Sequence, residues 1–143
     1  MPKTTNHTSV DDLNRANVGK LPEHLGLKII DVVEGRVAGR FDVRPDLVAH
    51  TGYLLAGVVL GIADLLCAYG VSTMWPEGAN GFTTAEAKCN FMGTITAGSG
   101  IVTAEILHSG RTTQIWDAKF TDEASGRLLA VFRCTQIILY PRA

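Results

Sequence analysis

The chain has 143 residues, of which 46% are hydrophobic and 19% charged, and its formal net charge is −1 at pH 7. We therefore expect one domain with a real core, and the near-neutral charge argues against a nucleic-acid partner. The three cysteines form no CxxC motif and the four histidines are scattered, which favours buried, reduced thiols and no metal site. The polar amino terminus lacks the apolar segment of a secretory signal, so a cytoplasmic protein is expected.

The amino-terminal part predicts a flexible segment over residues 1–20 that contains one short helix. Ser9 followed by Asp12 resembles a helix N-cap with an acidic third residue, so we expect this helix over residues 10–17. The single folded domain is expected over residues 21–143.

Two strands come next in the chain. The segments 28–33 and 36–43 flank Glu34-Gly35, a two-residue turn of the hairpin type. The second segment alternates apolar and polar residues, which is typical of a strand with one buried face.

The segment from Gly52 to Gly70 is apolar or small at nearly every position. It is long enough for about four turns of helix, and Gly70 is suited to end it. The segment is short for a membrane span, and the carboxylate of Asp64 would be costly at bilayer depth. We therefore expect a core helix that other elements cover. Asp64 is then either a structural carboxylate that reaches a cleft or bonds a nearby backbone group, or a catalytic acid or base tuned by its apolar surroundings.

Four further strands follow a connection that contains Trp75. We expect them over residues 82–91, 101–108, 112–120 and 128–140, with Thr84, Glu86 and Lys88 on one face of the first. Strands on both sides of one long helix predict an α+β fold with a mostly antiparallel sheet. The chain is too short to cover the rest of the apolar helix, which predicts a homodimer or a dimer of dimers.

This order of elements, with its short motifs, resembles the hotdog fold of the small acyl-CoA thioesterases of the phenylacetate-degradation and 4-hydroxybenzoyl-CoA thioesterase type. The resemblance covers about residues 20–140. It rests on Leu25-Gly26, Gly52-Tyr53-Leu54, Ala63-Asp64, the segment 82–91, Ser109-Gly110-Arg111-Thr112-Thr113, Thr121-Asp122 and Gly126-Arg127-Leu128.

The resemblance implies a catalytic role for Asp64, as general base or as nucleophile. In that family the helix is entered through a His-Gly-Gly triplet nine positions before the acid, where this chain has Leu55-Ala56-Gly57. The family's oxyanion hole is a backbone N–H at the helix start, which falls on Ala56, and a backbone donor there needs no particular side chain. The family's histidine is missing at Leu55, and its amide residue falls on Ala49, so the neighbouring His50 is either a replacement or a solvent-facing loop residue.

The resemblance also assigns binding residues. A Ser or Thr of the other subunit's strand can hold the attacking water in that family, and by position this is Thr83 or Thr84, unless the residue simply suits a strand. Arg111 matches the turn near the coenzyme A entrance. The acyl pocket would be lined by Tyr53, Leu54, Val58 and Trp75, beside Leu55 and Gly57.

The sequence therefore predicts a hydrolase of acyl-CoA or acyl-carrier thioesters that uses no cofactor, coenzyme A being part of the substrate, and needs no membrane partner. The alternative is a non-catalytic hotdog protein that binds an acyl thioester or another apolar ligand, because the family's histidine and amide are missing. A hydratase of the same fold ranks last, since only His50 could pair with Asp64.

Overall fold

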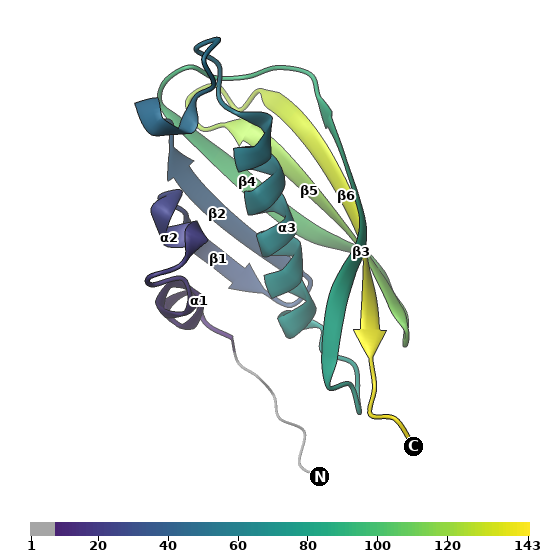
Figure 1. The fold of residues 1–143 in the computed structure, drawn as a ribbon. Coiled ribbons are helices and arrows are strands. Elements are labelled where there is room, and N and C mark those ends of the chain that lie inside the picture. Colours follow the sequence, from purple (N-terminus) through teal and green to yellow (C-terminus); the bar gives the residue numbers. More distant parts are fainter. Residues whose placement is uncertain (1–7) are drawn as a thin grey trace.

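A computed structural model describes residues 8–143 of the chain. Six strands form one sheet in the order β1-β2-β4-β5-β6-β3, each pair antiparallel, and helix α3 lies across one face of it (Figure 1). This α+β arrangement confirms the predicted fold class. The strands are β1 (Lys28–Val33), β2 (Arg36–Asp42), β3 (Gly81–Phe91), β4 (Ser99–Ser109), β5 (Thr113–Asp122) and β6 (Leu128–Leu139).

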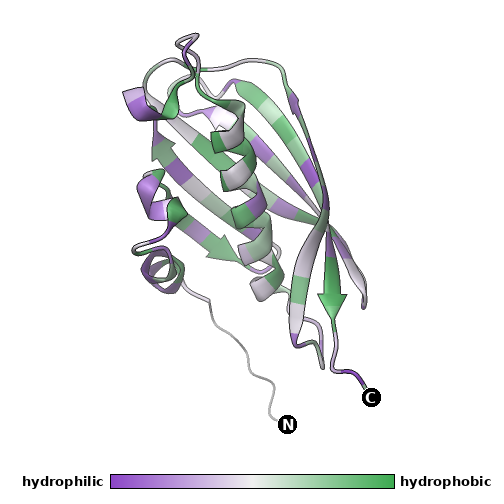
Figure 2. Cartoon of the chain, viewed as in Figure 1, coloured by the Kyte–Doolittle hydropathy of each residue, from purple (hydrophilic) through white to green (hydrophobic). Residues whose placement is uncertain are grey.

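The core fills the space between α3 and the inner face of the sheet. Polar and apolar residues alternate along several strands (Figure 2), and the inward residues of β6 are all buried. Trp116 on β5 is fully buried, and Phe41 and Phe120 stack with ring centroids 5.8 Å apart. Side-chain alternation thus places one face of each central strand against the helix.

The amino-terminal helix is docked on the sheet. Helix α1 (Val10–Ala16) has the capping box expected from Ser9 and Asp12, and the short helix α2 (Leu21–His24) follows it. The side chain of Asn14 makes two hydrogen bonds to the backbone of Ile29 on β1, at 2.9 and 3.0 Å. Residues 1–7 of the expected flexible segment lie outside the described residues.

Helix α3 runs over Ala56–Thr73, so it begins and ends later than the sequence predicted. Gly70 does not end the helix. A Cβ atom at Gly70 would lie 2.4 Å from the ring of Trp116, so the glycine provides room for this buried indole. A short 3₁₀ turn (Pro45–Leu47) and an extended loop lead into the helix.

By length and composition alone, α3 is long and apolar enough to cross a membrane, a test that the core helix of a globular domain also passes. One face of α3 packs on the sheet, which is what the sequence predicted for a core helix. Eight of its residues are buried, namely Val58, Val59, Ile62, Ala63, Leu66, Cys67, Gly70 and Val71.

Within residues 8–143, strand β3 forms one edge of the sheet and pairs only with β6. Most of its residues are exposed, so neither of its faces is well covered in the single chain. The register of the pair shifts between Thr84 and Glu86. Because an inserted residue turns the side chains that follow to the opposite face, Thr84 faces the helix while Glu86 and Lys88 face outward. The expectation that these three residues share one face was therefore wrong.

Candidate active site

Asp64 lies in the middle of α3, where its partly buried side chain points toward β3. The hydroxyl of Thr84 lies 2.9 Å from Asp64 Oδ1 and donates a hydrogen bond to it. The same hydroxyl lies 3.1 Å from Oε1 of Gln136 on β6. An ion-pair partner for Asp64 is absent from residues 8–143. The carboxylate is therefore held by one neutral hydroxyl group, and its second oxygen accepts no hydrogen bond from residues 8–143, so it can accept one from another donor.

The two threonine candidates on β3 have different positions. Thr84 pairs with Gln136 in the sheet register and faces α3, whereas Thr83 pairs with Ile137 and faces away from the helix. The structure thus brings Thr84, and not Thr83, to Asp64. The resemblance implied a Ser or Thr of the other subunit that holds the attacking water. Within one chain, Thr84 instead lies beside the Asp64 carboxylate and donates a hydrogen bond to it.

Gln136 was missed by the sequence analysis, although a signal was present. It is fully buried, and it occupies an inward position of β6 between Cys134 and Ile138. Its Nε2 atom lies 3.4 Å from Sγ of Cys134, whose thiol in turn contacts Cys67 of α3. A polar amide at an inward-facing position of an otherwise apolar strand is unusual and needs a specific hydrogen-bond partner.

The amino terminus of α3 offers free backbone donors. Leu55 occupies the N-cap position but makes no side-chain hydrogen bond to the helix. Ala56 and Gly57 are exposed, and neither amide has an acceptor within residues 8–143. Helix dipoles favour negative charge at this position, so this end of the helix suits an oxyanion.

Ala56 and Asp64 are far apart within one chain. Asp64 comes eight positions after Ala56 in the helix, which corresponds to about 12 Å along the axis. An oxyanion donor and a base must each come within hydrogen-bond reach, about 3 Å, of the same carbonyl group or its attacking water. A single chain therefore does not bring these two candidates to one thioester.

The loop before α3 separates the remaining candidates. His50 and Tyr53 are exposed, and no contact joins His50 to Asp64 among the described residues. Leu54 forms an isolated bridge with Val48 and is buried, as is Val58. Leu54 and Val58, which were expected to line the acyl pocket, thus belong to the core of the single chain.

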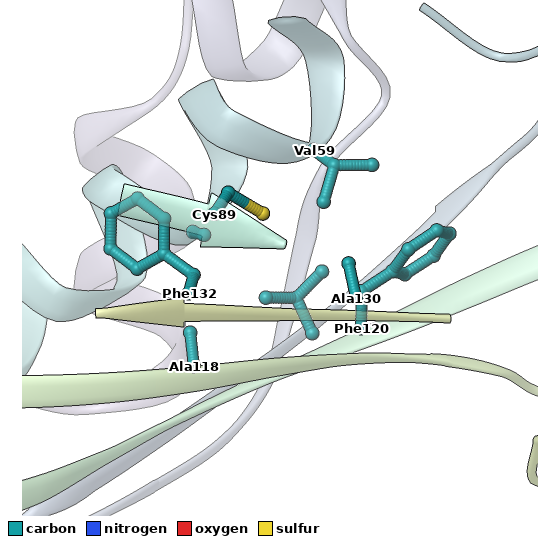
Figure 3. A pocket seen from close by; sticks show the side chains of 8 residues that line it. Val59, Cys89, Ala118, Phe120, Ala130 and Phe132 are labelled. Atoms are coloured by element: carbon teal, nitrogen blue, oxygen red, sulfur yellow. The ribbon is translucent and has the colours of Figure 1, made fainter. Parts of the chain in front are cut away.

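The space between α3 and the inner face of the sheet is closed. Figure 3 shows the apolar side chains that converge there from the helix and the sheet. The remaining space has no volume that could take a water molecule. Residues lining it are Val59, Ala63, Cys89, Val102, Ala118, Phe120, Ala130 and Phe132. An acyl group would therefore have to bind on the surface of this chain or against a second copy.

The thiols of Cys67 and Cys89 are poorly suited to attack a carbonyl. Burial raises the pKa of the Cys89 thiol. The hydrogen bond with Cys134, together with burial, raises the pKa of Cys67. Since thiolates and not thiols are the nucleophiles, neither residue is activated. Residues 8–143 contain no group of three or more His, Cys, Asp or Glu placed to hold a metal ion. Asp64 remains the best candidate for the reacting group.

A surface pocket of about 530 Å³ lies at the carboxy-terminal end of α3. The guanidinium of Arg111 lies 4.5 Å from the ring centroid of Tyr140, and none of the ion pairs among the described residues involves it. Trp75 lines the same pocket, at the opposite end of α3 from Tyr53, so these two aromatic residues do not share one pocket in the chain. The full lining is Met74, Trp75, Pro76, Glu77, Ser109, Gly110, Arg111 and Tyr140.

Comparison with known proteins gives a consistent result. A family model described as the thioesterase superfamily matches residues 51–129. The 1,4-dihydroxy-2-naphthoyl-CoA hydrolase of Listeria monocytogenes (serotype 1/2a, strain 10403S) is 31% identical over 115 residues, which cover 80% of this chain and 92% of the relative.

Solved structures show the same fold. A thioesterase from Haemophilus influenzae superposes with a TM-score of 0.87 at 20% identity, covering 95% of this chain and 94% of the other. The PaaI protein of E. coli, from the phenylacetic acid degradation operon, superposes with a TM-score of 0.81 at 18% identity, covering 95% and 96%. These likenesses confirm the hotdog fold.

The family match spans more than half of the chain and includes Asp64 and Thr84. It confirms, at family level, the expected enzyme class, a hydrolase of thioester bonds. The chain belongs to the thioesterase superfamily.

Proposed function

We propose that the protein hydrolyses an acyl-CoA or acyl-carrier thioester, with Asp64 as the base or nucleophile and the Ala56 N–H as the oxyanion donor. The observation that carries this proposal is the Asp64–Thr84 hydrogen bond of 2.9 Å in a member of the thioesterase superfamily. The name of the Listeria relative supports a coenzyme A thioester as the substrate class. A cytoplasmic location and a reaction without a cofactor belong to the same proposal.

In the general-base route, Thr84 holds one oxygen of Asp64 and the other oxygen accepts a proton from water. The water oxygen bonds to the thioester carbon, and the carbonyl electrons move onto oxygen, where a helix amide stabilises the charge. Collapse of this intermediate breaks the C–S bond, and the proton held by Asp64 passes to the leaving sulfur. In the nucleophilic route, an oxygen of Asp64 bonds to the thioester carbon and the C–S bond breaks, so that the thiolate leaves, takes a proton from water, and an acyl–Asp64 anhydride remains. Water then hydrolyses this anhydride to the free acid and the Asp64 carboxylate.

The exposed edge of β3 supports a homodimer. An uncovered edge strand of 11 residues presents unpaired backbone groups that commonly pair with a second chain. The adjoining face of α3 exposes Gly57 and Gly61, two small residues that would let a second helix approach closely. Pairing of β3 with the β3 strand of a second copy would cover both features, with the same surface used on each protomer.

This dimer would also complete the site. Ala56 and Asp64 lie at equal distances along α3 from Leu60. A two-fold axis near Leu60 would therefore place the partner's Ala56 at the height of Asp64, in an antiparallel helix pair. The separation of about 12 Å within one chain supports such a composite site.

The Arg111 pocket is our proposed binding site for the charged end of coenzyme A. Arg111 is free of carboxylate partners among the described residues, and guanidinium groups bind phosphate oxygens well. Its stacking on Tyr140 fixes the group at the rim of the pocket.

Leu55 favours a second candidate function, a binding protein without turnover. Its exposed aliphatic side chain stands at the N-cap of α3, where the resemblance implies histidine. Free-thiol release from acyl-CoAs with short, medium and aromatic acyl groups separates the two functions when wild type is assayed beside Asp64→Asn and Leu55→His.

We expect turnover by the wild type and a loss of about 10²- to 10⁴-fold in Asp64→Asn, the usual contribution of a general base. Turnover that survives this substitution would exclude Asp64 as the reacting group. An inactive wild type that gains turnover in Leu55→His would instead establish the binding function.

A further inference from the structure

The two hydrogen bonds of the Thr84 hydroxyl cannot form together while Oε1 of the Gln136 amide faces it. Thr84 Oγ1 lies 2.9 Å from Asp64 Oδ1 and 3.1 Å from Gln136 Oε1. A hydroxyl carries one proton, so it can donate to only one of these two acceptors. If the proton points to Asp64, the Thr84 and Gln136 oxygens face each other without a hydrogen between them.

Turning the amide by 180° removes this conflict. The oxygen and nitrogen of an amide are told apart by their hydrogen-bond partners. In the turned orientation Nε2 donates to Thr84 Oγ1, and Oε1 accepts from the Cys134 thiol, 3.4 Å from the amide. Each hydrogen bond of this series then has one donor and one acceptor, from Cys134 in the core through Gln136 and Thr84 to Asp64.

The series of hydrogen bonds from Cys134 through Gln136 to Thr84 is buried, which fixes the direction in which each of its protons points. Gln136, Cys67 and Cys134 are all at most 1% exposed, so water does not compete for their hydrogen bonds. An amide N–H directed at the Thr84 oxygen occupies a lone pair there and leaves the hydroxyl proton for Asp64. The carboxylate is thereby held in one rotamer, with one oxygen engaged and the other available for water.

We propose that Gln136 is a positioning residue, which fixes the Thr84 hydroxyl as a donor to Asp64 and so orients the carboxylate for attack. This inference rests on the proposed function, because it assigns Gln136 to the reaction at Asp64. Gln136 itself touches neither substrate nor reacting atoms in this account.

The chain offers a matched control. Gln114 on β5 is also fully buried, and it binds Trp116 Nε1 and the Met74 carbonyl, both at 2.9 Å. Gln136→Met and Gln114→Met each keep side-chain length and remove an amide from the same sheet. Both should lower the thermal unfolding midpoint, since each leaves buried polar partners unsatisfied.

Only Gln136→Met should change the reaction. We expect kcat for the best acyl-CoA substrate to fall by about tenfold to a hundredfold with KM unchanged, as for a misplaced catalytic group. Gln114→Met should retain kcat within about twofold. In a Thr84→Val background, Gln136→Met should have no further effect on kcat, because the hydroxyl through which it acts is gone.

A second readout does not depend on turnover. The side-chain amide resonances of Gln136 in a ¹H–¹⁵N spectrum should move in Thr84→Val, while those of Gln114 stay in place. An active wild type in which Gln136→Met and Gln114→Met have the same kcat, or in which Gln136→Met and Thr84→Val act additively, would overturn this inference alone. An inactive wild type would overturn the proposed function together with it.

Discussion

The two ends of α3 are built differently. At the carboxy-terminal end, Gly70 packs against Trp116, and Gln114 donates a hydrogen bond of 2.9 Å to the Met74 carbonyl. At the amino-terminal end, Leu55 provides no cap, and Ala56 is exposed. One end of the helix is anchored to the sheet, and the other end keeps its backbone donors free.

The carboxy-terminal end of α3 therefore contributes to stability, and the amino-terminal end supplies hydrogen-bond donors for a reaction. Free amides at a helix start are normally satisfied by a capping side chain, which contributes about 0.5–2 kcal/mol. The absence of such a cap leaves the donors available to a ligand. The contacts at the far end hold the helix in place, so the open end can be preorganised without a cap of its own.

The strongest test of the open end is Ala56→Pro. Proline is well tolerated at the first position of a helix, and Leu55 already has the extended backbone that a residue before proline requires. The substitution should therefore remove the amide donor with little change in stability. We expect kcat for acyl-CoA hydrolysis to fall by about 10²- to 10³-fold, as for loss of one oxyanion donor.

The Ala56→Pro result needs a control that keeps the donor. Ala56→Ser changes the side chain and retains the amide, so it should lose far less kcat than Ala56→Pro. Equal kcat in Ala56→Pro and wild type, measured on folded protein, would show that the open end of α3 takes no part in the reaction.

The closed end should respond in the opposite way to Gly70→Ala. The added Cβ would lie 2.4 Å from the Trp116 ring, which is fully buried and cannot move freely. We expect the free energy of unfolding in urea to fall by about 1–3 kcal/mol, with kcat of the folded protein unchanged. Combining it with Trp116→Phe should recover part of this loss, because the smaller ring relieves the overlap. A higher free energy of unfolding in Gly70→Ala than in wild type would show that close packing against Trp116 does not limit the side chain at this position.

Most of the fold could be predicted from the sequence. Alternation and turn residues placed all six strands, and the apolar segment with Asp64 gave the core helix. The end of that helix could not be predicted, since Gly70 is a stop signal by local rules. Only the three-dimensional contact with Trp116 shows that its role is to make room.

The candidate site was less predictable. Asp64 stands out because a carboxylate in an apolar helix needs a reason, but its partners depend on tertiary structure. The bulge after Thr84 decides which β3 residues face the helix, and a register shift of this kind leaves no clear mark in the sequence. Gln136 can be identified as a candidate site residue only once it is known that its side chain faces inward from β6.

The central claim is that the open end of one α3 and the Asp64 of another form one site. It is tested most directly by co-expressing Asp64→Asn and Ala56→Pro chains with different affinity tags and assaying the purified heterodimer. If the site is shared, each parent homodimer has little turnover and the heterodimer recovers about half of the wild-type kcat per dimer, because one of its two sites is intact. A heterodimer that forms but stays as inactive as its parents would contradict the shared site.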